Sequence, residues 1–177
     1  MRTLDLLFPG LASMDNVHPL FVHFPIAFFF GALFVEGMAI ARDEKIHLVA
    51  TWMLYMGAVC AILAAATGLI AEYAVAAGDP RGHDSPAHGY VHIHRAWMVG
   101  ITLFSLLLSA YLFWINSKGR WSSHRWAFAL GLFVLCAVVS MGADRGARLV
   151  YEFGAGVNPA VLKIEAPSHP HDDGHTH

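Results

Sequence analysis

NVHPLFVHFPIAFFFGALFV, residues 16–35, contains no Asp, Glu, Lys or Arg, and three further stretches of the chain share this property. They cover Ile46–Ala71, Ala96–Ser117 and Trp126–Ala143. Each stretch has about 18 to 26 residues, and a helix of that length matches a hydrocarbon core about 30 Å thick. A spanning strand would need only about 10 residues of alternating polarity, a pattern that these stretches lack. The sequence therefore predicts four transmembrane helices.

The composition excludes several classes of protein. Of the 177 residues, 56% are hydrophobic and 14% are charged, whereas a soluble domain carries about 25% charged residues. A water-soluble globular domain is therefore not expected. The formal net charge of -2 also gives no basic surface for nucleic acid. Cys60 and Cys136 stand far apart, without the spacing of a zinc ribbon, a thioredoxin motif or a covalent haem.

Short connections between the four stretches make neighbouring helices antiparallel, so the fold class is an all-α, up-down four-helix bundle with both termini on one side. We expect an interfacial N-terminal segment over residues 1–15, a transmembrane domain over residues 16–157 and a disordered, His-rich tail over residues 158–177. Within the domain, helices are expected over about residues 17–41, 46–77, 90–117 and 124–150.

Basic residues in short loops indicate the orientation of the bundle. Five of them lie in the two compact connections on one side: Arg42, Lys45, Lys118, Arg120 and Arg125. Six on the other side are spread over longer segments together with most of the acidic residues: Arg2, Arg81, Arg95, Arg145, Arg148 and Lys163. The compact set predicts the inner face, which places both termini outside a bacterial inner membrane, in the periplasm.

Polar residues collect at the outer end of the predicted bundle. With antiparallel helices, that end receives His18, His23, Glu72, Tyr73, His88, His92, His94, Arg95, Asp144, Arg145 and Arg148. Ionisable groups inside a membrane span are functional candidates. The opposite end has His47, His124 and ordinary loop charges, and Glu36 is a lone acid in the inner half of the first helix.

Two histidines on facing helices beside several arginines suit a b-type haem, because imidazoles ligate the iron and cations meet the propionates. We predict His23 and His94 as the axial pair and Arg95, Arg145 and Arg148 as propionate partners. His18 would belong to any shallower second pair. Such a protein would exchange electrons with a periplasmic or membrane redox partner.

Two other functions stay open. Asp84, His88 and His92 recur every four residues, a spacing that binds zinc, copper or nickel on a helix, although Gly82, Pro86 and Gly89 disfavour a helix there. A metal-handling or transport-accessory protein would use these histidines together with His83 and the tail residues His169, His171, His175 and His177. The third hypothesis is a structural membrane subunit with no prosthetic group.

Motifs of a stand-alone enzyme are missing: the sequence has no GxSxG, HExxH or glycine-rich phosphate loop. An electron-transfer or accessory subunit is therefore expected. Besides the lipid bilayer, a second copy of the chain is a possible partner, because Ala61, Ala65 and Gly68 give the second helix a face of small residues.

Four stretches carry a family resemblance: HPLFVHFPIAFFFGALFVE (18–36), ATGLIAE (66–72), HIHRAW (92–97) and RGARLVYEFGAGV (145–157). Through them the chain resembles the bacterial transmembrane family catalogued as domain of unknown function 2231, over about residues 16–157. The resemblance implies a small four-helix membrane protein and supplies no activity. Some relatives have a histidine near the end of the fourth helix, where this chain has Asp144, so we expect one haem rather than two.

Overall fold

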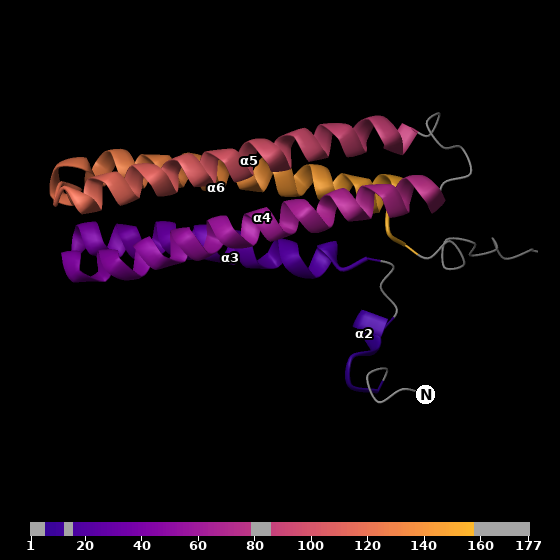
Figure 1. The fold of residues 1–177 in the computed structure, drawn as a ribbon, viewed down its shortest axis with the longest axis horizontal. Helices are drawn as coiled ribbons and strands as arrows, with labels where there is room; N and C mark the ends of the chain where they lie inside the picture. Colours follow the sequence, from indigo (N-terminus) through magenta and orange to yellow (C-terminus); the bar gives the residue numbers. More distant parts are fainter. Residues whose placement is uncertain (1–5, 13–15, 79–85, 158–177) are drawn as a thin grey trace, which may run out of the picture.

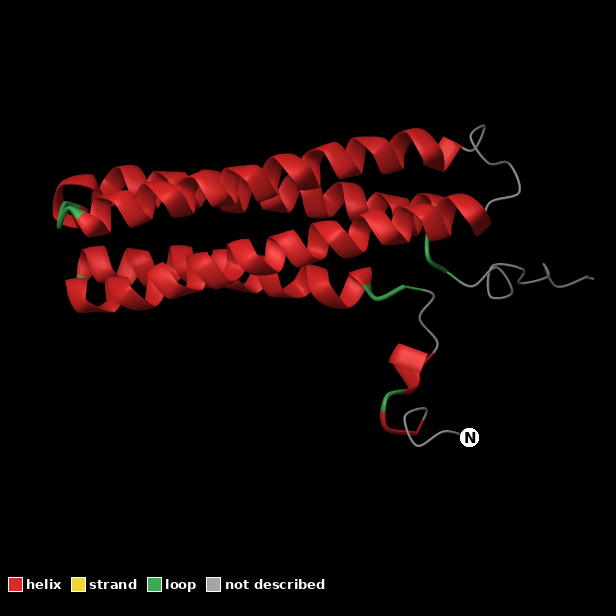
Figure 2. Cartoon of the chain, viewed as in Figure 1, coloured by secondary structure: helices red, strands yellow, loops and turns green. Residues whose placement is uncertain are grey.

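The structure, a computed structural model, describes residues 6–12, 16–78 and 86–157, and those residues form helices and short connections without any strand. The four long helices are α3 (His18–Ala41), α4 (His47–Gly78), α5 (Pro86–Ser117) and α6 (Trp121–Phe153). A short helix, α2 (Pro9–Ala12), precedes them, and a 3-10 turn, η1 (Glu44–Ile46), joins α3 to α4 (Figures 1 and 2). The predicted all-α class is confirmed.

The long helices form a closed ring in the order of the chain. Helix α3 packs against α4 and α6, and α5 packs against the same two helices, so α3 and α5 lie diagonally opposite each other. The α3–α4 and α5–α6 connections meet at one end of the bundle, which we call the turn end (Figure 1). The other end contains the first residues of α3 and α5 and the last of α6, and we call it the histidine end. This arrangement is the predicted up-down four-helix bundle.

The helices α5 and α6 are longer than the sequence alone indicated. Helix α5 begins at Pro86, a position where proline is tolerated because the first helical N–H groups have no partner in the helix. As a result His88 and His92 lie on a helix despite the neighbouring glycine and proline. Helix α6 ends at Gly154, whose φ of 66° is left-handed and lets the Ala155 N–H donate to the Leu149 carbonyl at 3.0 Å.

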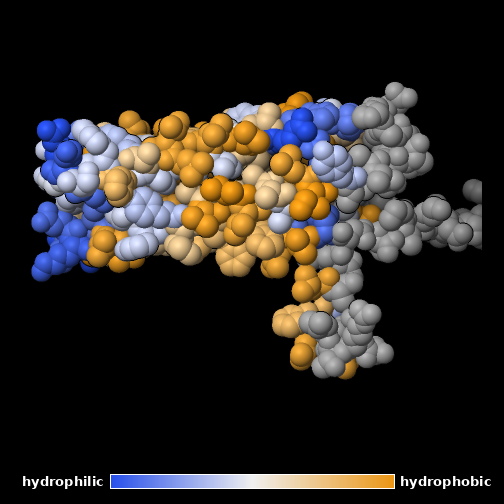
Figure 3. All heavy atoms as spheres, in the orientation of Figure 1, coloured by the Kyte–Doolittle hydropathy of each residue, from blue (hydrophilic) through white to orange (hydrophobic). Residues whose placement is uncertain are grey.

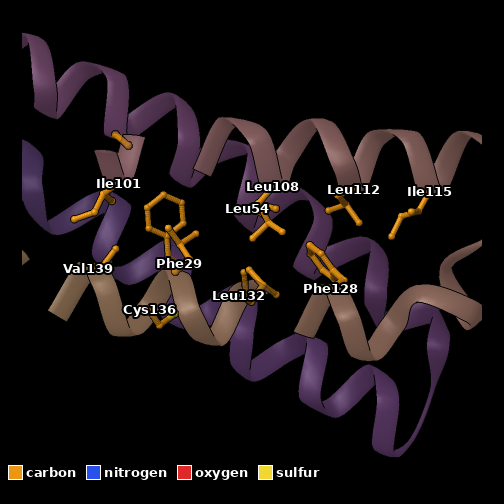
Figure 4. Packing of buried hydrophobic residues seen from close by; sticks show 13 residues of the cluster. Phe29, Leu54, Ile101, Leu108, Leu112, Ile115, Phe128, Leu132, Cys136 and Val139 are labelled. Carbon is orange, nitrogen blue, oxygen red and sulfur yellow. The ribbon is translucent and has the colours of Figure 1, made fainter. Parts of the chain in front are cut away.

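The core is apolar and runs along the bundle axis. Its best-buried members come from all four helices: Phe29, Ala32, Leu54, Leu108, Leu112, Ile115, Phe128, Leu132 and Leu135 (Figure 4). Phe29 and Leu54 belong to the first hairpin, and they pack with Leu108 and Leu132 of the second. The two hairpins therefore share one close-packed core.

The outer surface is also apolar. Phe34, Ile70 and Leu107 are each about two-thirds exposed, at 70%, 67% and 69%, which water would penalise and lipid would not. Figure 3 shows hydrophobic atoms over the middle of the visible face, with polar residues gathered toward the ends. All four long helices are long and apolar enough to cross a membrane. The fold is that of a membrane protein whose lipid-facing band lies between two polar ends.

Candidate functional site at the histidine end

His18 opens α3 and turns its ring toward α4. The Asn16 side chain accepts a hydrogen bond from the His18 backbone N–H at 3.2 Å and fixes the start of the helix. The His18 Nδ1 lies 3.0 Å from the Ala64 carbonyl and 3.3 Å from Thr67 Oγ1. Since a carbonyl can only accept, Nδ1 carries the proton and Nε2 has the free lone pair.

A glycine makes room for this ring. A Cβ atom added at Gly68 would lie 3.0 Å from the Cε1 of His18, closer than ordinary packing allows. Any larger residue at this position of α4 would push the imidazole out of place. The His18 ring therefore packs directly against the α4 backbone at Gly68.

His94 occupies the matching position on α5 and packs against α6. A Cβ added at Gly146 would lie 3.0 Å from its Cε1. The Gly142 backbone is close to the ring, but Nδ1 is buried and makes no hydrogen bond of acceptable geometry with any described residue. A buried polar atom without a partner costs free energy, so the His94 ring is held by fewer polar contacts than the His18 ring.

The two histidines are equivalent by the construction of the bundle. His18 and Gly68 belong to the α3–α4 hairpin, and 50 residues separate them; His94 and Gly146 belong to the α5–α6 hairpin, and 52 residues separate them. Helices α3 and α5 are diagonal, and the two imidazoles are near enough to interact electrostatically. Each hairpin therefore contributes one imidazole over one glycine, from opposite sides of the bundle.

The structure places His18, rather than His23, among the packed helices. His23 is exposed, and its Nδ1–H donates to the Pro19 carbonyl of its own helix at 2.6 Å. Five residues along a helix correspond to a rotation of about 140° between His18 and His23, so only one of them can face inward. The packing of α3 selects His18.

The three arginines predicted to meet propionates all have other partners. Arg95 donates from Nη1 to both carboxylate oxygens of Glu72, at 2.9 and 3.1 Å. Arg145 lies over the Trp97 ring at 3.9 Å and donates to the Met141 carbonyl at 2.6 Å. Arg148 lies over Tyr90 at 4.3 Å and donates to Glu152 at 2.7 Å. Arg145 precedes Gly146 in the sequence. Of the five N–H donors of its guanidinium, one donates to the Met141 carbonyl.

Of the residues predicted to bind a metal, His88 and His92 are brought together, with their Nε2 atoms 2.9 Å apart. Asp84, His83 and the tail histidines lie outside the described residues. Within the described residues, His, Cys, Asp and Glu form no group of three or more suited to a metal ion.

A second polar cluster, at the turn end, was not anticipated from the sequence. Glu36 of α3 is completely buried, at 0% exposure. Its Oε2 shares a hydrogen bond with His47 Nδ1 at 2.6 Å, and its Oε1 accepts from the indole N–H of Trp121 at 2.7 Å. Asn116 completes the contact on the far side of His47, with Oδ1 at 3.1 Å from Nε2. These side chains, the turn-end network, come from all four long helices.

The hydrogen bonds of the turn-end network show that His47 Nε2 carries a proton. The Thr51 hydroxyl donates to the His47 carbonyl at 2.9 Å, so toward Asn116 it can only accept, and the Asn116 amide nitrogen donates to it at 3.4 Å. The Asn116 oxygen then faces His47 Nε2, which must donate. One proton lies between His47 Nδ1 and Glu36 Oε2, so the two side chains together carry no net charge. The turn end therefore buries a hydrogen-bonded pair of a carboxyl group and an imidazole.

The pattern predicted for the chain as a whole matches one family. The model of the family described as predicted membrane protein (DUF2231) matches residues 14–159. No curated protein and no solved structure shows significant similarity to the chain. The match includes all four long helices with both polar clusters, and the chain belongs to the DUF2231 family of predicted membrane proteins.

Proposed function

We propose that this membrane protein binds one b-type haem between His18 and His94 and acts as a small electron-transfer or redox-accessory subunit. The observation that carries the proposal is the pair of imidazoles, one from each hairpin, each packed over a glycine at the histidine end. A six-coordinate haem takes two axial ligands from the protein, because the porphyrin supplies the other four nitrogens. A bound haem would supply reversible one-electron transfer.

The hydrogen bonding of the two rings supports a ligand role. Metal-bound histidines commonly donate their second ring N–H to a carbonyl, which fixes the tautomer. His18 has this arrangement, with Nδ1 on the Ala64 carbonyl and Nε2 left for the iron. In His94, the buried Nδ1 lies beside the Gly142 backbone, and Nε2 is the nitrogen that we propose for the iron.

Charge also favours a porphyrin over a bare ion between the helices. Two neutral imidazoles would leave a divalent ion with its full charge in the interior of the bundle, away from water, which is costly. A porphyrin carries two negative charges on its nitrogens and offsets those of the iron. We propose Arg145 for the propionates, since most of its N–H donors bond to no described residue.

The absorption spectrum of the detergent-purified protein, air-oxidised and then reduced with dithionite, tests the proposal. We expect a Soret band and a reduced α band of the b type, with close to one haem per chain. His18→Ala and His94→Ala should each abolish the bands while the protein still inserts into the membrane. His23→Ala is the matched control and should keep the full spectrum, because that ring faces outward.

Retention of the full spectrum in both inward variants would remove the axial assignment. A colourless wild-type protein, produced with an ample haem supply, would overturn the haem proposal itself. Its copper, zinc and nickel content would then separate a metal-handling protein from a structural subunit.

For the orientation, we propose that the histidine end faces the periplasm and the turn end the cytoplasm of a bacterial inner membrane. Arg42, Lys45, Lys118 and Arg120 flank the two connections of the turn end, and short basic loops stay inside. Electrons would then be exchanged with a periplasmic or membrane-bound redox partner at the histidine end.

A further inference from the structure

A second pair of histidines lies at the histidine end, outside the site between His18 and His94. His88 and His92 are one helical turn apart on α5, with their Nε2 atoms 2.9 Å apart and their ring centroids 4.4 Å apart. The rings are perpendicular, at 89°. The two Nε2 atoms share a hydrogen bond, in which one ring donates and the other accepts, and the imidazoles approach each other from successive turns of one helix.

A carboxyl group of a neighbouring helix lies beside one ring. Glu72 of α4 has Oε1 3.4 Å from His92 Nδ1. Arg95 donates to both oxygens of the same side chain, which holds Glu72 in place. An acceptor beside Nδ1 favours the tautomer in which Nδ1 carries the proton and Nε2 of His92 accepts from His88.

We propose that His88 and His92 bind a divalent transition-metal ion, with zinc or copper the best suited, and that Glu72 positions His92 for it. Imidazole is a preferred ligand of both ions, and the carboxylate–histidine–metal arrangement is a recurrent support for such sites. With bonds of about 2.0 to 2.1 Å and tetrahedral angles, the two nitrogens would lie about 3.3 Å apart. The present separation of 2.9 Å differs from that by a few tenths of an ångström.

The site is reachable from solution. The His92 side chain is 40% exposed, and the pair lies near the first residue of α5, at one polar end of the bundle. Water would complete the coordination. The inference does not depend on haem, because neither ring belongs to the proposed axial pair.

Modification of the full-length protein by diethyl pyrocarbonate, mapped on each peptide by mass spectrometry, tests the site. Free imidazole nitrogens react with this reagent and metal-bound ones do not. We expect Zn²⁺ to slow the modification of His88 and His92 several-fold, with one common midpoint concentration. His23 is exposed at a distant face and should react at the same rate with and without Zn²⁺.

Variants separate a shared site from independent binding. In His92→Gln, Zn²⁺ should no longer protect His88, and in Glu72→Gln the midpoint should move to a higher Zn²⁺ concentration. His23→Gln is the matched control and should leave the protection intact. Protection of His88 that survives His92→Gln, or protection confined to the peptide of the tail histidines, would overturn the proposal. The Soret band of the variants should be unchanged, so failure here is distinct from failure of the haem site.

Discussion

Glu36 is the residue whose surroundings constrain it most. Its carboxyl group, with no exposure inside the bundle, shares one hydrogen bond with the His47 imidazole and accepts one from an indole. Removing one member of such a buried pair leaves the other without its partner, and the cost is up to about 3 to 5 kcal/mol. The pair is thus a strict local requirement of the fold, whatever the protein binds.

Replacing Glu36 tests this requirement. Glu36→Ala should lower the free energy of unfolding by about 3 to 5 kcal/mol, measured by reversible denaturation in mixed detergent micelles. Adding His47→Ala to that background should cost much less than His47→Ala alone, because the imidazole has already lost its buried partner. Glu44→Ala, at an exposed position of η1, is the control. Additive effects of Glu36→Ala and His47→Ala would contradict the coupling of the two side chains.

Trp121 offers a second test at the same carboxylate. Trp121→Phe keeps an aromatic ring but deletes the N–H that donates to Glu36 at 2.7 Å. An unsatisfied buried acceptor costs about 1 to 3 kcal/mol, and we expect that loss in the same unfolding measurement. Trp126→Phe is the matched control, because Trp126 is 68% exposed. Equal effects of both substitutions would argue against the indole bond.

The sequence predicted only part of the surroundings of Glu36. Glu36 stood out as an acid inside an apolar span, yet its partners are 11 and 85 residues away, on other helices. Which side of α3 faces inward depends on packing with α4 and α6, and the same packing selects His18 over His23. A lone acid in a span does require a partner, and His47, the first residue of α4, was the available signal.

Among the secondary-structure elements, α4 and α6 act through residues that have no side chain. Gly68 and Gly146 let the rings of His18 and His94 approach the helix backbones. The charge-free stretches predicted that these helices exist, because length and hydrophobicity are local properties. They did not predict which glycines the two imidazole rings pack against, since a glycine in a membrane helix can also serve helix–helix contact.

Alanine at these glycines provides an element-scale prediction. Gly146→Ala would place a methyl group 3.0 Å from the His94 ring and should lower the haem content, read from the Soret absorbance per chain. Gly100→Ala, on α5 with nothing within 4 Å, should leave the haem content unchanged and stabilise the helix by about 1 kcal/mol. The same haem content in both variants would contradict a role of Gly146 in positioning the His94 ring.

At the scale of the whole molecule, the bundle consists of two similar hairpins. Beyond the pairs at the histidine end, His47 follows His18 by 29 residues and His124 follows His94 by 30. His47 bonds to Glu36 of the preceding helix, and the His124 ring bonds to Tyr111 of its own preceding helix, at 2.8 Å. The hairpins thus match in layout and differ in charge, with the buried acid in the first one only.

The orientation of the whole bundle is open to a direct measurement. Cysteines introduced as Glu44→Cys and Lys118→Cys lie at the turn end, and Glu152→Cys lies near the end of α6. With the outer membrane permeabilised, an impermeant maleimide should label only Glu152→Cys until the inner membrane is opened. The native Cys60 and Cys136, inside α4 and α6, are replaced by Ala beforehand. Labelling of Glu44→Cys alone in closed cells would invert the orientation.

The position of His47 only 11 residues after Glu36 has a consequence for biosynthesis. Helices α3 and α4 leave the ribosome before α5 and α6, and their hairpin already contains the Glu36 carboxyl group together with its imidazole partner. Glu36 can therefore enter the bilayer as half of a neutral pair, before Asn116 and Trp121 have been synthesised. The first half of the chain neutralises its own acid during insertion, and the second half then adds its hydrogen bonds to a pair that is already in the membrane.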